Sequence, residues 1–258
     1  MENHLVSIIT PSYNSEKFIV ATIDSVRNQT YRHWEMIIVD DCSNDQTTAI
    51  VEEIIKSENR IRLVKLAENS GAGVARNRAI KEANGRFIAF LDADDLWKPE
   101  KLEKQVSFLL SEDQAFTFSF YEWIDENGDS LHKIIEAPLK LTYNQLFWSN
   151  LVGNLTGIYD AQKLGKIEIS SLRKRQDWMV WLTILKQLKT AKPIPESLAY
   201  YRVRQDSISA SKWSLVKHNY KVYRIFHKKN AAVAGLLMIG FLFTHFFSKP
   251  KYVKKASI

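Results

Sequence analysis

Three aspartates stand within four positions of this sequence, directly after the apolar run at residues 87–91: Asp92, Asp94 and Asp95. Enzyme-bound magnesium usually takes one or two carboxylates and completes its shell with water and substrate phosphates. The cluster can therefore hold a divalent cation and orient a sugar or ribose hydroxyl with its remaining oxygen atoms. A structural alternative is that one aspartate caps the helix that follows.

The segments around this cluster predict alternating strands and helices. Apolar, β-branched runs indicate strands, and a segment with helical periodicity follows each of them. The strands are expected at 5–10, 34–40, 61–66 and 86–92, and the helices at 15–29, 45–57, 71–84 and from Pro99 onward. This alternation is typical of βαβ units, so we predict an α/β fold with a mostly parallel sheet flanked by helices.

A polar cluster begins where each of these strands is expected to end. Besides the three aspartates, the clusters are TPSYN with Pro11 and Tyr13, the pair Asp40 and Asp41, and the glycine loop ENSGAG at 68–73. Ligands bind at the carboxyl edge of an open parallel sheet, where the strand order reverses. We therefore expect these side chains to share one rim.

The glycine loop only partly matches the dinucleotide-binding fingerprint. Gly71 and Gly73 are present, but Arg76 stands where a third glycine belongs, and the loop follows the third strand instead of the first. A helix that begins after such a loop can lie near an anionic group. A tight turn that packs the helix on the sheet is the alternative.

Four segments in the first 110 residues resemble, in order, the motifs of family 2 glycosyltransferases with the GT-A fold. They are VSIITPSYN, IIVDDCSNDQT, ENSGAGVARNRAI and FIAFLDADDLWKPEKL. The resemblance implies a Rossmann-like nucleotide-binding sheet, a nucleotide-diphospho-sugar donor, a Mg²⁺ or Mn²⁺ ion, and inversion at the anomeric carbon. The resemblance to this family also makes UDP the expected nucleotide.

The resemblance also implies which residues bind the nucleotide-sugar: Pro11, Tyr13, Asp40, Asp41, Gly71, Arg76, Asp92, Asp94 and Arg204. Within this set, the aspartate pair after the second strand contacts the nucleobase, and the DAD segment meets the ribose and the metal. For the metal itself we expect Asp94 and Asp95.

The second half of the chain is less regular, with strands expected around an Asn-Gly turn at 127–128 and a clear amphipathic helix at 177–188. RKRQDWMVWLTIL resembles the block of the family whose aspartate acts as the general base, and this role falls on Asp177. Gln176 replaces the usual glutamate there, and Met179 replaces a second acid. A helix first-turn acid is the structural alternative for Asp177.

A further segment, LAYYRVRQDSIS, resembles a block that usually carries a histidine where this chain has Arg204. Because arginine stays charged and donates in a fork, Arg204 can face the pyrophosphate; a surface arginine is the alternative. The Gln-x-x-Arg-Trp motif of processive members is absent, which favours the addition of a single sugar per encounter.

Basic charge is concentrated in the tail. After Asp206 there are ten lysines and arginines and no acidic residue, which leaves 26 basic against 29 acidic side chains in residues 1–206. The tail also holds an apolar run at 231–247. We expect residues 212–255 to lie on an anionic membrane surface, because such a surface attracts the basic residues on both sides of this run. Burial against the body or a second subunit, and true spanning, are the alternatives.

We therefore predict a GT-A domain at 1–210, with a nucleotide-sugar half at 1–112 and an acceptor and catalytic half at 113–210, followed by a basic helical tail at 211–258. The single cysteine and the N-terminus, which does not resemble a signal peptide, favour a cytoplasmic enzyme on the inner membrane face. Its acceptor is expected to be a lipid-linked or surface polysaccharide. A non-catalytic nucleotide-sugar-binding protein, a nucleic-acid-binding protein and a nucleotidyltransferase are the competing interpretations.

Overall fold

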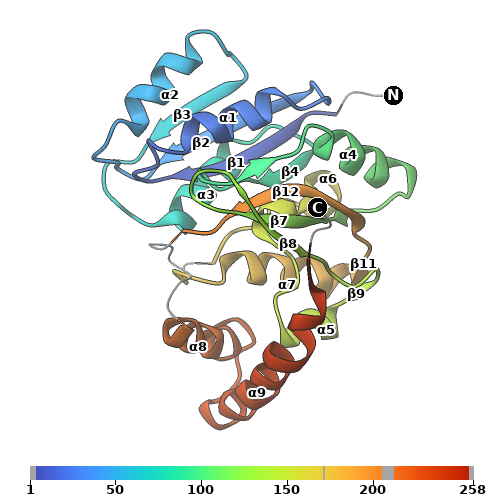
Figure 1. The fold of residues 1–258 in the computed structure, drawn as a ribbon. Helices are drawn as coiled ribbons and strands as arrows, with labels where there is room; N and C mark the ends of the chain where they lie inside the picture. The colour runs from blue at the N-terminus through green and yellow to red at the C-terminus, as the bar shows by residue number, and fades with distance from the viewer. Residues whose placement is uncertain (1–3, 171, 205–211, 256–258) are drawn as a thin grey trace.

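The computed structural model describes residues 4–170, 172–204 and 212–255 (Figure 1). Within these residues, a six-stranded sheet has the strand order β3-β2-β1-β4-β10-β6. Its strands are β1 (Val6–Ser12), β2 (Trp34–Asp40), β3 (Ile61–Lys65), β4 (Phe87–Phe90), β6 (Phe116–Thr117) and β10 (Ile158–Asp160). The first four are parallel, and β10 runs antiparallel to β4 and β6. The predicted mostly parallel α/β sheet is confirmed.

Alternate residues of these strands face two different cores. Ile8 and Ile38 point into one core, which the helices α1 (Ile19–Arg27), α2 (Thr47–Ile55) and α4 (Lys101–Ser111) cover. Ile9 and Ile37 point into the other, which α3 (Ala72–Glu82) and α7 (Gln176–Leu188) cover. A parallel sheet buried on both faces favours runs of apolar residues, which β4 and residues 36–39 of β2 carry.

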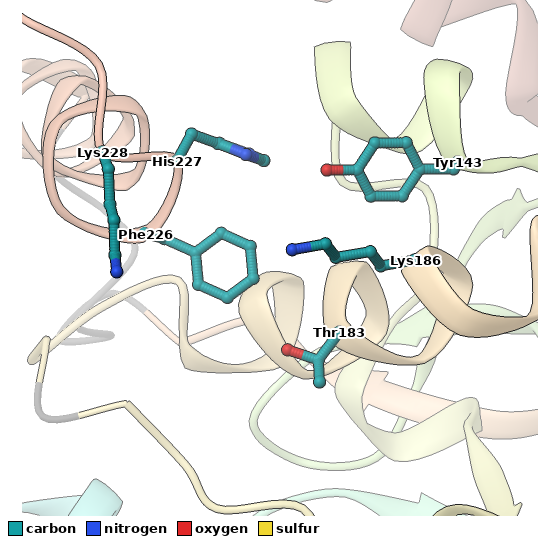
Figure 2. A pocket seen from close by; sticks show the side chains of 6 residues that line it. All are labelled: Tyr143, Thr183, Lys186, Phe226, His227 and Lys228. Atoms are coloured by element: carbon teal, nitrogen blue, oxygen red, sulfur yellow. The ribbon is translucent and has the colours of Figure 1, made fainter.

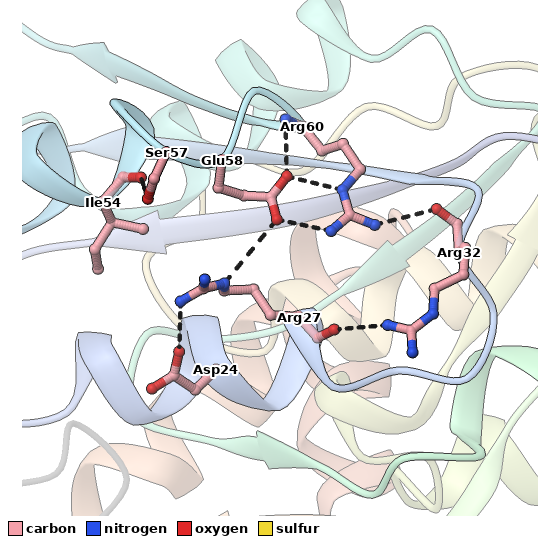
Figure 3. Close-up of polar contacts among 7 residues, drawn as sticks. All are labelled: Asp24, Arg27, Arg32, Ile54, Ser57, Glu58 and Arg60. Atoms are coloured by element: carbon pink, nitrogen blue, oxygen red, sulfur yellow. Dashed lines mark hydrogen bonds and ion pairs between the residues drawn. The ribbon is translucent and has the colours of Figure 1, made fainter.

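A cluster of ion pairs holds the amino ends of β2 and β3, at the edge opposite to the rim that was predicted to bind ligands (Figure 3). Glu58 accepts from the guanidinium of Arg60 at 2.7 Å and lies 4.0 Å from that of Arg27. The hydrogen bond from Arg60 lowers the pKa of the Glu58 carboxyl. These charges join helix ends to strand starts and have a structural role.

A second sheet is built mostly from the second half of the chain, and among the described residues its strand order is β13-β8-β7-β12-β5. Its strands are β5 (Leu96–Trp97), β7 (Ser119–Ile124), β8 (Ser130–Ile135), β12 (Ile194–Arg202) and β13 (Val253–Lys255). The Asn-Gly turn joins β7 to β8 as predicted, with Gly128 at φ +96°. Because β5 directly follows the aspartate cluster and pairs with β12, this sheet begins at the predicted ligand-binding rim.

Shorter elements complete the second half of the chain before the tail. They are a ribbon of β9 (Leu141–Thr142) and β11 (Thr190–Ala191), the helices α5 (Tyr143–Trp148) and α6 (Ala161–Leu164), and the 3₁₀ turn η1 (Asn154–Thr156). Thr142 and Gln145 form a reciprocal capping box that fixes the start of α5.

The tail is helical, as predicted, and runs through α8 (Lys212–Lys221), η2 (Val222–Phe226), α9 (Ala231–Phe243), η3 (Thr244–Ser248) and η4 (Lys249–Tyr252). One side of α9 packs on the body, where the Phe241 ring lies 5.9 Å from that of Trp178. The other side exposes Leu236, Ile239 and Phe243, each more than 60% accessible. By length and hydropathy, Ala231–Tyr252 is the one helix among the described residues that could cross a membrane, and only 17% of its most apolar window is buried.

Candidate active site

The ends of β1 and β2 bring the predicted nucleotide-side residues to one rim. Pro11 is buried within β1 beside Val39 of β2, and Tyr13, just beyond the strand, is 46% exposed. Asp40 accepts hydrogen bonds from the Ser43 amide at 2.9 Å and the Ser43 hydroxyl at 2.5 Å. The aspartate that ends β2 is therefore held in place by its own loop.

Asp41 connects this rim to the glycine loop. Its two carboxylate oxygens accept from the backbone N–H groups of Ser70 and Gly71, both at 2.7 Å. Gly71 has φ +89°, a conformation that favours glycine, and it precedes the first residue of α3. Both predicted residues thus shape the loop that leads into α3.

The three aspartates of the cluster have different surroundings. The side chains of Asp92 and Asp94 are 31% and 27% exposed, whereas Asp95 is almost fully buried. Asp95 accepts from the backbone N–H of Arg202 at 2.9 Å, and so holds the end of β12. Burial raises the pKa of the Asp95 carboxyl well above its usual range, and the charges of Asp94 and Asp92 add to this effect.

Two arginines pair with the exposed aspartates. Arg204 donates to Asp94 at 3.0 Å, and its guanidinium lies 4.9 Å from the centre of the Phe18 ring. Arg76 donates to Asp92 at 2.5 Å. Residues 205–209, the rest of the motif that contains Arg204, lie outside the described residues.

The partly exposed carboxylates of Asp92 and Asp94 could hold a divalent cation that shares its shell with substrate. Burial, followed by the charge of Asp92, raises the pKa of the Asp94 carboxyl, so a cation beside it would relieve unfavourable negative charge. In the described part of the chain, no group of three or more His, Cys, Asp and Glu side chains is arranged to hold a metal. A site here would therefore use one or two carboxylates plus phosphate and water, which suits Mg²⁺ or Mn²⁺.

Arg76 also links the aspartate cluster to α7. Besides Asp92, it donates to the side-chain oxygen of Gln176 at 2.7 Å. Gln176 in turn donates to the Leu172 carbonyl at 2.9 Å, so its amide is fully oriented. Gln176, which replaces the usual glutamate, thus still accepts a hydrogen bond from Arg76. Through Arg76, Asp92 is linked to Gln176, the residue directly before Asp177.

Asp177 lies in the first turn of α7 and is partly exposed. Asn150 donates to its Oδ2 atom at 2.7 Å. The preceding Arg175 adopts a left-handed conformation at the start of the helix and donates to Asn219 of α8 at 2.6 Å. The carboxylate is therefore fixed through one oxygen, at a helix end that favours negative charge.

The sequence did not point to three cationic residues at this site. Arg202 donates to the Asp94 carbonyl at 2.9 Å and is buried. Arg175 and Lys249 lie near Asp177: burial, then the Arg175 charge, lowers the Lys249 pKa to about 8, and Asp177 opposes this effect. Arg175 and Arg202 stand inside recognised motifs, but Lys249 comes from the distant tail and has no sequence signal.

Comparisons with known proteins identify the family of this chain. A model of the family described as glycosyl transferase family 2 matches residues 7–169. The chain is 47% identical over 220 residues to a putative teichuronic acid biosynthesis glycosyltransferase, TuaG, of Bacillus subtilis, a match that covers 85% of this chain and 87% of the relative. It is 39% identical over 246 residues to the Escherichia coli UDP-Glc:alpha-D-GlcNAc-diphosphoundecaprenol beta-1,3-glucosyltransferase WfgD, a match that covers 92% and 95%.

Among solved structures, Staphylococcus aureus TarS residues 1–349 in complex with UDP has a TM-score of 0.69 at 25% identity, over 95% of this chain and 73% of that one. The same protein in complex with UDP-GlcNAc has a TM-score of 0.73 at 24% identity, over 95% and 74%, which bears on the fold alone. Fold, motif order and relatives agree. The chain belongs to glycosyl transferase family 2 and is a glycosyltransferase with the GT-A fold.

Proposed function

We propose that this enzyme transfers one sugar from a nucleotide-diphospho-sugar, preferably a UDP-sugar, to a hydroxyl group of a lipid-linked or surface polysaccharide, with inversion. The observation that carries the proposal is the connection Asp92–Arg76–Gln176, which couples the aspartate cluster to the helix start that bears Asp177. A relative whose name specifies a UDP-Glc donor and a diphosphoundecaprenol-linked acceptor supports the same reaction class.

In this mechanism Asp177 is the general base. Its Oδ2 atom is held by Asn150, which leaves Oδ1 to take the proton of the acceptor hydroxyl. The acceptor oxygen then forms its bond to the anomeric carbon opposite the bond to the departing nucleoside diphosphate, and the configuration inverts. A positioned general base typically contributes about 10²–10⁴-fold to the rate.

The leaving group is proposed to lie on the aspartate-cluster side. Asp94, with Asp92 as its neighbour, would hold a divalent cation, and Arg204 beside Asp94 would face the pyrophosphate. When bound, such a cation supplies charge neutralisation for the departing diphosphate. Asp95 points to the Arg202 backbone in this structure. The UDP titration described below therefore tests whether Asp95 also binds the metal.

We place this enzyme at the inner face of the membrane. The exposed side of α9 is apolar, and its flanks are basic at Lys228 and Lys229 before the helix and at the exposed Lys251 and Lys254 after it. An anionic leaflet attracts each basic residue near it by about 1 kcal/mol, and the apolar side chains can enter the headgroup boundary. This arrangement suits a lipid-linked acceptor.

Calorimetric titration with UDP, with and without Mn²⁺, tests the donor site. Wild type and Asp95→Asn are expected to bind UDP in a metal-dependent way, because asparagine still accepts from the Arg202 amide. Asp94→Asn is expected to lose the metal dependence. Equal loss in both variants would instead make Asp95 a metal ligand, and no UDP binding by the wild type would contradict the proposed donor.

Asp177→Asn tests the catalytic step separately. The amide is nearly isosteric but cannot take the acceptor proton, so the rate of sugar transfer is expected to fall by about 10²–10⁴-fold with UDP affinity unchanged. Transfer at the wild-type rate would remove Asp177 from the role of base.

A further inference from the structure

A cavity of about 370 Å³ lies away from the proposed transfer site, between α5, α7 and the turn that follows η2 (Figure 2). Its lining residues are Tyr143, Thr183, Lys186, Phe226, His227 and Lys228. Thr183 and Lys186 come six and nine residues after Asp177 on α7, or about 9 and 13 Å further along the helix axis. The residues assigned to sugar transfer do not line this cavity.

Polar groups converge in this cavity. Figure 2 shows the Tyr143 hydroxyl, the Lys186 ammonium group and the His227 ring directed toward the same space. The Nε2 atom of His227 is buried and finds no hydrogen-bond partner among the residues that the structure describes. Its ring is fixed by stacking on Tyr223, with ring centres 5.8 Å apart. A buried ring nitrogen without a partner is costly, so the cavity offers a hydrogen-bonding group to a ligand.

The charge of the cavity is positive. Lys186 and Lys228 both line it, and across the described parts of the chain no carboxylate forms an ion pair with either of them. Burial, with the charges of Lys229 and Lys186, lowers the pKa of His227 to about 4, and burial raises the pKa of Tyr143. At neutral pH the cavity therefore presents the ammonium group of Lys186, a phenol and a neutral imidazole, a set that suits a phosphate group, while the ammonium group of Lys228 lies at its edge, beyond the Phe226 ring (Figure 2).

The cavity lies beside the tail, because its lining residues Phe226, His227 and Lys228 form the end of η2 and the turn that leads into α9. Helix α9 packs against η2 and exposes Leu236 and Ile239, at 67% and 65%. A ligand that fits both features has a phosphate-bearing head and an apolar chain.

We infer that this cavity binds the phosphate of an anionic membrane lipid, whose acyl chains lie along the apolar side of α9. The inference rests on the membrane attachment in the proposed function. To the general electrostatic attraction of the basic tail it adds a specific binding site for a lipid headgroup. It requires no change in the transfer mechanism.

Vesicle binding tests this site with matched charge. Lys186→Gln/Lys228→Gln removes the charge inside the cavity and one at its edge, and Lys217→Gln/Lys251→Gln removes two from exposed tail positions outside it. On phosphatidylcholine vesicles that contain phosphatidylglycerol, the cavity pair is expected to lose at least about tenfold more affinity than the control pair, because the charge-assisted hydrogen bond from Lys186 is lost. Tyr143→Phe, which changes no charge, is expected to lose about fivefold. Equal losses in the two lysine pairs would overturn the inference.

A soluble lipid separates the site from the membrane attachment. Monomeric dihexanoyl-phosphatidylglycerol is expected to bind the wild type more tightly than dihexanoyl-phosphatidylcholine or inorganic phosphate, and Lys186→Gln is expected to abolish the difference. Binding of inorganic phosphate as tight as that of the lipid would assign the cavity to a free anion and overturn the inference. If the monomeric lipid binds but vesicles do not, the proposed membrane attachment is wrong, whereas the headgroup site is supported. Sugar transfer is measured in a separate assay, so its failure can be told apart from both.

Discussion

At the scale of single residues, the absence of a side chain at Gly73 permits the connection between the two halves of the site. A methyl group at this position would overlap the side-chain amide of Gln176. Gly73→Ala is therefore expected to displace Gln176 from Arg76 and to lower kcat/KM by about ten- to hundredfold, since a hydrogen bond to a charged group contributes about 1.5–3 kcal/mol. Steady-state transfer kinetics measure this loss.

The double variant Gly73→Ala/Gln176→Ala is the control for this prediction. It removes the overlap, so thermal stability is expected to recover, while Arg76 still lacks its partner and activity stays low. A Gly73→Ala enzyme with wild-type kinetics would show that the Arg76–Gln176 contact does not support catalysis.

Single residues also mark the limit of prediction from the sequence. The convergence of Asp40, Asp41 and the aspartate cluster followed from one fact, that parallel strands end at the same edge. The direction of each carboxylate did not follow. The backbone N–H of Asp95 donates to the Asp92 carbonyl at 3.1 Å, and this turn directs Asp95 inward to Arg202, a partner more than one hundred residues away.

At the scale of elements, the first half was predictable because local pattern and burial coincide there. The predicted strand at 34–40 has the same bounds as β2. The second sheet depends on distant pairings: β12 joins β5 and β7, and β13 of the tail adds to the edge of β8 with Val253 opposite Ile135. No local pattern in a basic tail indicates such a strand.

The docking of α9 on the body gives an element-scale prediction. A methyl group at Gly240 would overlap the Trp148 ring, whereas Gly235, on the same helix, has open space around it. Gly240→Ala is expected to destabilise the protein by about 1–3 kcal/mol through overpacking. Gly235→Ala is expected to stabilise it by about 0.4–1 kcal/mol, because alanine restricts the unfolded chain. Thermal unfolding and limited proteolysis measure both; the same sign in both variants would mean that α9 does not pack against α5.

At the scale of the whole molecule, the tail connects two proposed roles, membrane attachment and sugar transfer. It carries an exposed apolar surface and all of the net positive charge, and it also brings Lys249 near Asp177. A protein held to a membrane by α9 would thus keep its proposed catalytic base close to the membrane surface. This geometry favours an acceptor whose growing end remains near the lipid that carries it.

The apolar side of α9 supplies a test of this orientation. Leu236→Ser/Ile239→Ser removes two exposed apolar side chains from the tail, and Leu131→Ser/Leu139→Ser removes two from β8 and the loop beyond it. Since burying one leucine or isoleucine side chain contributes about 1.5–3 kcal/mol, the α9 pair is expected to weaken binding to neutral vesicles by at least about a hundredfold, with UDP affinity unchanged. Vesicle flotation at physiological salt measures this binding. Because salt then screens interactions between charges more than about 8 Å apart, the measurement isolates the contribution of the apolar side chains to membrane binding. Equal retention of both pairs on the vesicles would mean that another surface meets the membrane, and transfer to a lipid-linked acceptor would then have to proceed without this orientation.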